Sequence, residues 1–356
     1  MSATERLMHL IDTVQPADMS AEERAWVRLD SLTKPRRSLG RLEEIAAAVA
    51  RIQGTEHPSV ERKAILLMAG DHGVAVEGVS SYPQSVTLQM VANFATGGAA
   101  INQIARSVDA ELRLYDVGVA GDTSGLGGVY QIKVAEGTEN MRHGPALSTV
   151  QAVEAVLSGA EAASAAVSDG VTLLGTGEMG IGNTTAAAAL TAAYTGVSPE
   201  RVVGPGTGLD EAGVAHKTTV VRDALARNVA PGTDALGILA SVGGAEIAGL
   251  AGVMIGGAAL RACVLVDGFI SGAAALAAVA LCPACRDYLL ASHRSLEPGH
   301  SIQLEHLGMR PVLDLDLRLG EGTGAALAMA LVDAACRMLS GMATFDEAGV
   351  SGSDAT

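Results

Sequence analysis

One glutamate lies in a run of glycines directly before an apolar segment. Glu321 is the second residue of Gly320-Glu321-Gly322-Thr323-Gly324, and the apolar residues 325–331 follow at once. Glycine lets the backbone turn tightly and lets a ligand approach closely, while the start of a helix favours an ionised carboxylate. The pattern therefore indicates a charged group held beside an open space. An ordinary helix start with turn glycines fits the same stretch.

Two more glycine-rich loops have the features of an anion site. Residues 177–185 (GEMGIGNTT) open an alanine-rich helix, and residues 203–210 (VGPGTGLD) precede a helix that carries Lys217. Backbone amides and hydroxyls at a helix start suit a phosphate, and Lys217 could point back at it. No Gly-Lys-Ser or Gly-Lys-Thr occurs, so this is not the P-loop pattern. Glycines chosen for close packing and an exposed lysine are the ordinary alternatives.

Three further polar segments accompany these loops. Residues 81–90 combine Tyr82 with amides and methionine at a helix start, a set that suits a flat heteroaromatic ring, unless Tyr82 packs in the core. Residues 292–300 offer hydroxyls and an arginine that could receive a carboxylate, or they form a solvated loop. Asp71 and His72 are interpreted as groups that order a loop near the site, because the histidines lack the compact spacing of a metal site.

Composition narrows the classes of function. The chain has 356 residues, 49% of them hydrophobic, which is enough for a large core. A formal net charge of -15 argues against binding nucleic acid or anionic membranes through a general basic field. Four cysteines in so long a chain, and no apolar leader in residues 1–13, predict a reduced, cytoplasmic protein. Arg261 and Asp267 interrupt the stretch 249–285, so a buried strand with flanking helices is expected there, not a membrane span.

Short apolar runs that end in glycine- or acid-rich turns alternate with helical patterns. The expected strands are 64–69, 111–117, 171–174 and 263–266. The expected helices are 3–32, 41–51 with Ser38 as its cap, 85–106, 184–194, 216–227 and 323–339, followed by a disordered tail at 351–356. Cys282 and Cys285 are expected to be buried thiols in a helix-end turn. The alternation predicts an α/β fold with a parallel sheet buried on both faces, and ligands bind such sheets at the carboxyl ends of the strands.

Taken together and in order, the motifs resemble one enzyme family. They are 70–74 (GDHGV), 81–84 (SYPQ), 177–185 (GEMGIGNTT), 204–208 (GPGTG), 266–269 (VDGF), 292–295 (SHRS) and 318–324 (RLGEGTG). This set resembles the nicotinate-nucleotide–dimethylbenzimidazole phosphoribosyltransferases, which build the lower-ligand nucleotide of cobalamin. The resemblance extends over nearly the whole chain, from Leu32 to Leu339.

The resemblance implies transfer of phosphoribose from nicotinate mononucleotide to 5,6-dimethylbenzimidazole, which gives α-ribazole 5′-phosphate and nicotinate. It implies a Rossmann-like parallel sheet flanked by helices in a large catalytic domain (31–331), with a small helical domain made from residues 1–30 and 332–356. It also implies a homodimer. No metal or cofactor is expected. The same chemistry on another base, such as adenine or a phenolic acceptor, is one alternative. An inactive nucleotide-binding regulatory protein is another, disfavoured because Glu321 and Glu178 are both present.

The resemblance also assigns roles to individual residues. Glu321 matches the general base, and Glu178 matches a second acid in the site. The residues that match the benzimidazole pocket are Ser81, Tyr82 and Gln89, with Met90 nearby. The residues in the segments around the phosphate, ribose and nicotinate are Gly180, Gly182, Asn183, Gly206, Gly208, Lys217, Asp267 and Ser295. Arg37 departs from the family pattern, since a glycine usually stands there, and this leaves the conformation of its loop open.

Overall fold

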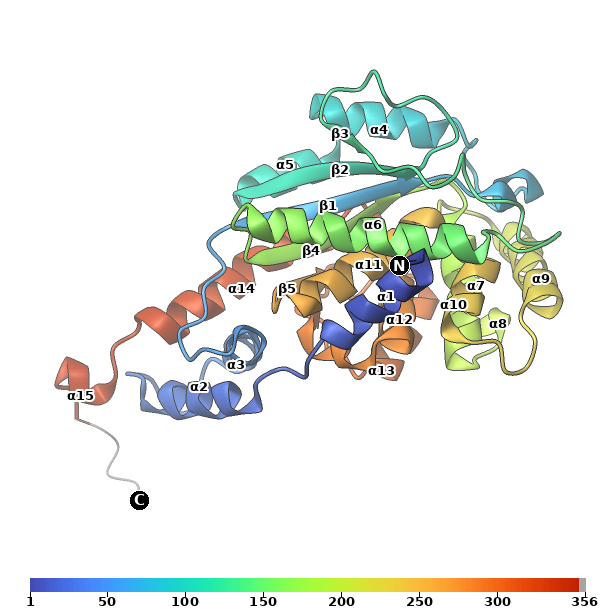
Figure 1. Cartoon of the computed structure of the whole chain (residues 1–356). Coiled ribbons are helices and arrows are strands. Elements are labelled where there is room, and N and C mark those ends of the chain that lie inside the picture. The colour runs from blue at the N-terminus through green and yellow to red at the C-terminus, as the bar shows by residue number, and fades with distance from the viewer. Residues whose placement is uncertain (352–356) are drawn as a thin grey trace.

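The molecule is built on one six-stranded parallel sheet with the order β3-β2-β1-β4-β5-β6 (Figure 1). The computed structural model describes residues 1–351. The strands are β1 (Lys63–Gly70), β2 (Ala110–Gly118), β3 (Val129–Gln131), β4 (Leu173–Met179), β5 (Cys263–Val266) and β6 (Leu289–Ala291). This is the strand order of Rossmann-like sheets, in which the order reverses between β1 and β4 and leaves a crevice at their carboxyl ends. The predicted α/β class is confirmed.

Helices cover both faces of the sheet, which explains why the strand sequences are apolar without alternation. On one face lie α6 (Thr149–Ser168) and α11 (Ala245–Ala259), and α6 runs in front of the sheet in Figure 1. On the other face lie α4 (Val86–Thr96), α5 (Ala100–Ser107) and α14 (Thr323–Gly341). Every residue of β1 is buried as a result.

The strand β4 is longer than expected and continues through Gly175, Thr176 and Gly177 to Met179. The sequence alone placed a turn at these glycines. In the structure, Gly177 lies against the backbone of Glu321, and a Cβ on Gly177 would come 2.7 Å from the Glu321 carbonyl oxygen. A glycine within a strand often marks such a close approach of another backbone.

Two predicted long helices are each divided into two. The expected helix 3–32 is α1 (Ala3–Thr13) and α2 (Met19–Ser31), because the Asp18 side chain accepts hydrogen bonds from the first amides of a new helix. The expected helix 85–106 is α4 followed by α5. The break comes at Gly97, whose φ of 82° ends α4. The predicted cap Ser38 is also wrong, since α3 (Arg41–Gln53) begins after Gly40.

The remaining helices complete the described part of the chain. They are α7 (Asn183–Thr195), α8 (Pro199–Val202), α9 (Glu211–Asn228), α10 (Ala235–Val242), α12 (Phe269–Leu281), α13 (Pro298–His306) and α15 (Phe345–Ala348), with the 3₁₀ helices η1 (Gly73–Glu77) and η2 (Pro283–Tyr288). The stretch 249–285 contains the end of α11, then β5 and α12, as predicted. Cys282 and Cys285 are buried free thiols.

By length and composition α14 could cross a membrane, but it packs against α3 and β4, and half of its apolar window is buried.

The segment after α2 lies beside the segment that follows α14. A β-bridge pairs Leu32 with Thr344, and α2 packs against α3 and α14. Arg37 takes a φ of 61°, the conformation a glycine would adopt, while its guanidinium lies 3.8 Å from the centre of the Trp26 ring and 2.8 Å from Asp30. These contacts stabilise the conformation of the loop around Arg37, which the sequence did not predict. Of the expected disordered tail, only Ser351 falls within the described residues.

The pair of helices α6 and α11 packs through glycines. A Cβ on Gly252 would overlap the carbonyl oxygen of Val156, so Gly252→Ala forces the helices apart. We expect it to lower the free energy of unfolding by about 1–3 kcal/mol, as overpacking of a tight core does, in denaturant titrations. The matched control is Gly341→Ala at the end of α14, where nothing lies within 4 Å of the added Cβ. Equal stability of the two variants would contradict this packing.

Candidate active site

A cavity of about 690 Å³ opens at the carboxyl ends of the strands, beside the point where the strand order reverses. Its walls come from the segments after β4, β5 and β6, from the turn before α14, and from α4 and its preceding loop. The cavity brings together these residues selected from the sequence: Tyr82, Met90, Glu178, Gly180, Asn183, Gly206, Asp267, Ser295 and Glu321. The topology alone predicts a ligand at this place.

The other selected residues lie near the cavity but do not line it. They are Ser81, Gln89, Gly182, Gly208 and Lys217. The side chains of Ser81 and Gln89 are exposed, and the backbone amide of Ser81 donates to Thr207 Oγ1 at 3.0 Å. That bond joins the segment 81–90 to the loop 204–208. Tyr82 is 55% exposed, so the alternative that it packs in the core is wrong.

Glu321 is held beside the cavity, as its sequence predicts. It is 6% exposed and has a φ of 63°, between two glycines that also have positive φ. Its Oε2 accepts a hydrogen bond from the amide of Ile101 at 3.4 Å, so the helix start that meets this carboxylate is that of α5, not of α14. Burial raises the pKa of Glu321, against the Ile101 amide, which lowers it. The carboxylate is therefore a stronger base than a solvated one.

Glu178 is a second buried carboxyl group in the same cavity. Burial raises its pKa to about 8, and the negative charges of Glu246 and Asp267 add to this effect. The Asn183 amide donates to its Oε2. Gly320 lies so close to Oε1 of Glu178 that a Cβ would overlap it. At neutral pH this group is therefore mainly protonated.

Asp267 is tied to the first turn of α14. Its Oδ1 accepts from the amide of Ala325 at 2.8 Å, and His293 Nδ1 lies 3.8 Å from the same oxygen. The His293 ring packs so closely against Gly324 that a Cβ there would overlap it. The contacts of Asp267 therefore fix the turn that contains Glu321 relative to the end of β5.

Lys217 is buried behind the cavity wall. It is 1% exposed, and its Nζ donates to Thr184 Oγ1 at 2.7 Å, so the alternative of an exposed lysine is wrong. Burial lowers its pKa to about 8. A Cβ on Gly206 would come 3.1 Å from Nζ. The two glycine-rich loops thus meet around one ammonium group, although they are separate in sequence.

Sequence reasoning assigned no role to three polar or charged side chains that line the cavity, His293, Glu297 and Arg318. All three fall within segments to which the sequence analysis drew attention. Only the fold shows which side chains of those segments turn towards the cavity.

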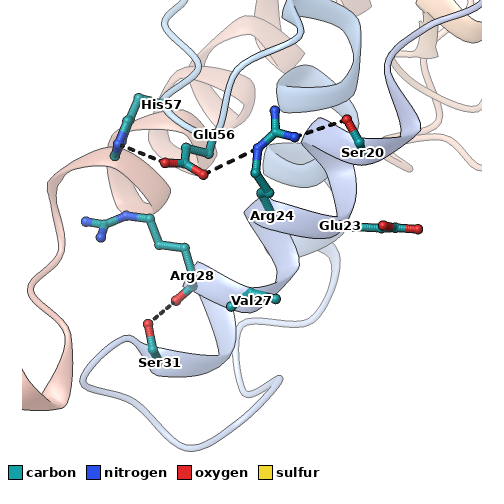
Figure 2. A pocket seen from close by; sticks show the side chains of 8 residues that line it. All are labelled: Ser20, Glu23, Arg24, Val27, Arg28, Ser31, Glu56 and His57. Atoms are coloured by element: carbon teal, nitrogen blue, oxygen red, sulfur yellow. Dashed lines mark hydrogen bonds and ion pairs between the residues drawn. The ribbon is translucent and has the colours of Figure 1, made fainter.

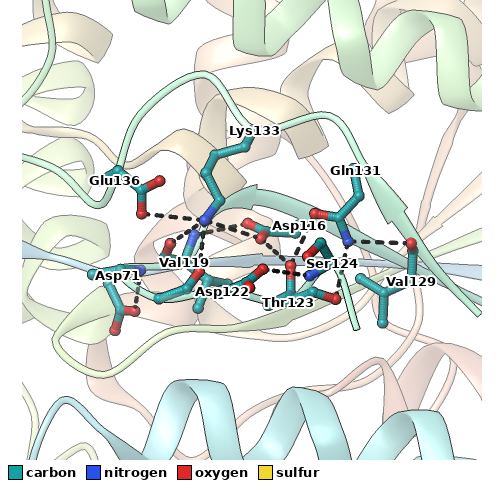
Figure 3. A network of polar contacts seen from close by, with 12 residues as sticks. Asp71, Asp116, Val119, Asp122, Thr123, Ser124, Val129, Gln131, Lys133 and Glu136 are labelled. Carbon is teal, nitrogen blue, oxygen red and sulfur yellow. Dashed lines mark hydrogen bonds and ion pairs between the residues drawn. The ribbon is translucent and has the colours of Figure 1, made fainter. Parts of the chain in front are cut away.

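A polar network orders the loop after β2 and joins it to Asp71 in the loop after β1 (Figure 3). Lys133 Nζ donates to the carbonyl oxygens of Val119 and Gly121 at 2.8 and 2.7 Å. The amide of Ala120, which lies between them, donates to Asp71 Oδ2 at 2.8 Å. His72 Nε2 lies 2.6 Å from Glu246 Oε1 in full burial. Asp71 and His72 therefore order this loop, as the sequence suggested.

A second hollow of about 510 Å³ lies between α2 and the segment after α3, and no residue of these motifs lines it (Figure 2). Arg24, Arg28 and Glu56 in its walls already contact one another or the backbone. Arg24 lies 3.6 Å from Glu56, and Arg28 donates to the carbonyl oxygens of Leu339 and Met342. These contacts join α2 to the end of α14 and leave no convergent set for a ligand. Within residues 1–351, no three His, Cys, Asp or Glu side chains cluster to hold a metal ion.

Comparison with known proteins gives one consistent result. A family model described as "Phosphoribosyltransferase" matches residues 14–350. Several relatives carry the name nicotinate-nucleotide–dimethylbenzimidazole phosphoribosyltransferase. The protein of Desulforudis audaxviator is 50% identical over 97% of this chain and 98% of the relative. The protein of Geobacter metallireducens is 49% identical over 97% of this chain and 98% of the relative. A crystal structure of the Thermus thermophilus protein of that name superposes with a TM-score of 0.90 at 50% identity, covering 94% of this chain and 100% of the other. The chain therefore belongs to the family of nicotinate-nucleotide–dimethylbenzimidazole phosphoribosyltransferases.

Proposed function

We propose that this cavity transfers phosphoribose from nicotinate mononucleotide to 5,6-dimethylbenzimidazole, releasing nicotinate and α-ribazole 5′-phosphate. The observation that carries the proposal is the pairing, in one cavity, of a buried base, Glu321, with an amide-rich loop beside the ammonium group of Lys217. The first group suits an acceptor ring that must lose a proton, and the second suits a phosphate. The names of the relatives support the same reaction.

The chemistry needs one base and no acid. The bond between the ribose anomeric carbon and the pyridinium nitrogen breaks, and its electron pair leaves with nicotinate, whose ring nitrogen becomes neutral. A benzimidazole nitrogen forms the new bond from the opposite face, so the anomeric centre inverts. The other ring nitrogen then gives its proton to Glu321. Because the attacking ring becomes positive, that proton is acidic enough for a carboxylate.

The cavity can position both substrates. We assign the phosphate to the loop 204–208, with Thr184 and Lys217 behind it, and the acceptor ring to the side formed by Tyr82, Met90 and Glu321. In this assignment Ser81 and Gln89, which are exposed, contact the acceptor from the rim. Holding both rings about the ribose converts a two-molecule encounter into a single step, which supplies much of the rate.

Replacing Lys217 tests the phosphate assignment. Because a hydrogen bond to a charged group contributes about 1.5–3 kcal/mol, Lys217→Ala is expected to raise the KM for nicotinate mononucleotide by roughly 10–100-fold. The KM for dimethylbenzimidazole and kcat should change much less. Arg227→Ala removes an exposed cation from the same helix and serves as the control. If only the KM for the benzimidazole moved, the phosphate would lie elsewhere.

The proposed reaction itself is tested by following nicotinate. Purified protein with nicotinate mononucleotide should release nicotinate only when dimethylbenzimidazole is added, in amounts equal to the acceptor consumed. A competition with adenine and a phenol in the same vessel addresses the alternative acceptors. Release that requires adenine or the phenol would replace the proposed acceptor. Release without any acceptor would indicate a hydrolase.

Two further features are proposed on the resemblance and the relatives. We propose a homodimer, which sedimentation of the purified chain would show as twice the mass of 35.9 kDa. We also propose a cytoplasmic enzyme with a small domain formed by residues 1–30 and 332–356, in line with the four buried free thiols and with the hydrogen bonds that Arg28 donates to the carbonyl oxygens of Leu339 and Met342.

A further inference from the structure

A carboxylate stands at the loop where the phosphate is proposed to bind. Glu297 precedes α13, lines the cavity and is 5% exposed. Its Oε1 accepts a hydrogen bond from the amide of Gly206 at 2.9 Å. Its Oε2 is buried and has no hydrogen-bond partner among the described residues. It faces Gly204 so closely that a Cβ on that glycine would overlap it.

The carboxylate of Glu297 belongs to a compact set of charges around this loop. Nζ of Lys217 lies beside Gly206, and Arg318 Nη1 donates to the Gly206 carbonyl oxygen at 3.5 Å. Burial raises the pKa of Glu297, while the charge of Lys217 and the Gly206 amide lower it. Burial likewise lowers the pKa of Lys217, and the charge of Glu297 opposes that effect. Each group therefore favours the charged form of the other.

This arrangement conflicts with a simple phosphate site. An amide at such a loop is a donor for an anion, yet here a carboxylate of the protein already uses it. A buried ammonium group without a counter-charge is costly, so an empty site needs an anion of its own. A phosphate bound at the Gly206 amide would lie next to the Glu297 carboxylate, and the two negative charges would repel each other.

We propose that Glu297 acts as an internal anion of the empty phosphate site. Glu297 shares the Gly206 amide and the charge of Lys217 with the phosphate of the nucleotide, and it thereby limits how tightly that phosphate binds. The inference rests on the proposed phosphate position. Glu297 keeps the loop ordered and Lys217 compensated before the substrate arrives. It also weakens the hold on the product, which carries the same phosphate, and so favours release.

The test measures anion binding without catalysis. Inorganic sulfate is the probe, because its charge of about -2 does not change near neutral pH, and calorimetry gives its dissociation constant. Glu297→Gln keeps an oxygen that can accept from Gly206 and removes only the charge. Sulfate is expected to bind this variant at least about tenfold more tightly than the wild type, from the loss of one like-charge repulsion in a partly buried site. The KM for nicotinate mononucleotide should fall with it.

Two variants separate charge from structure. Glu297→Asp retains the charge and is expected to bind sulfate within a few-fold of the wild type. Glu305→Gln makes the same chemical change at an exposed position on α13 and should leave sulfate binding unchanged. A Glu297→Gln protein that binds sulfate no better than the wild type would overturn the inference and show a purely structural cap.

The role of Glu297 and the proposed reaction can fail separately. If the wild type forms product but Glu297→Gln shows no gain in sulfate affinity, the role of Glu297 is wrong and the reaction stands. If sulfate binds more tightly to the variant but the wild type forms no product, the anion site with its internal carboxylate is supported and the proposed reaction is wrong.

Discussion

Replacing Glu321 with glutamine is expected to lower kcat by roughly 10²–10⁴-fold, the usual cost of losing a general base. Glutamine keeps the size and the acceptor oxygen that meets the Ile101 amide, so the fold should not change. The KM for nicotinate mononucleotide should stay close to that of the wild type, because Glu321 meets the acceptor ring and not the phosphate. Steady-state kinetics with both substrates varied measure this.

The pH dependence of turnover gives a second result from the same variant. A base must be ionised to take a proton, so the activity of the wild type should fall as the pH drops through the pKa of Glu321, which burial raises. The residual activity of Glu321→Gln should lack that acid limb. Glu305→Gln, at an exposed position, controls for loss of a charge. Near-normal turnover by Glu321→Gln would remove Glu321 from the role of base.

An alanine at Gly320 is expected to lower kcat/KM by about 10²-fold or more, the scale of losses from displaced catalytic groups. Gly320 has a φ of 81°, and its missing Cβ leaves the space in which Oε1 of Glu178 lies. The substitution strains the backbone by about 1–2 kcal/mol. It also pushes Glu178 away and turns the adjoining residue, Glu321. The carboxyl groups of Glu178 and Glu321 therefore move together.

The matched control for this change is Gly308→Ala. Gly308 has a φ of 60°, and nothing lies within 4 Å of the position of its added Cβ. Both variants should unfold at lower denaturant concentration, because both bear the backbone strain, and Gly320→Ala should lose more stability because its Cβ also overlaps Glu178. Only Gly320→Ala should lose activity. Equal losses of activity would mean that general destabilisation, and not displacement of Glu178, explains the effect.

The sequence predicted the part of the fold that depends on local pattern. Apolar runs that end in polar turns indicated the positions of four strands, and the buried β1 has this form along its whole length. The end of β4 was missed, because glycines there look like a turn until the backbone of Glu321 is seen against Gly177. The break between α4 and α5 at Gly97 was also missed, and with it the helix start that meets Glu321.

The chemistry of the site was harder to predict than the fold, because it depends on contacts between segments that are distant in the sequence. The motif around Glu321 predicted a carboxylate beside a space, and the structure places Glu321 at the cavity. The protonation of Glu178 could not be predicted, because its pKa of about 8 comes from burial and from Glu246 and Asp267, on other segments. Glu297 had no role in the sequence interpretation, since only the fold places it on the amide of Gly206. The roles of the individual site residues stay predictions.

The configuration of the glycosidic bond in the product tests the proposed reaction most directly. The protein would be incubated with nicotinate mononucleotide and 5,6-dimethylbenzimidazole, and the nucleotide product examined by NMR for the orientation of the base on the ribose. We predict only the α anomer, because the base attacks the face opposite to departing nicotinate within one cavity. A β product, or a mixture of anomers, would contradict a single inverting displacement at this site.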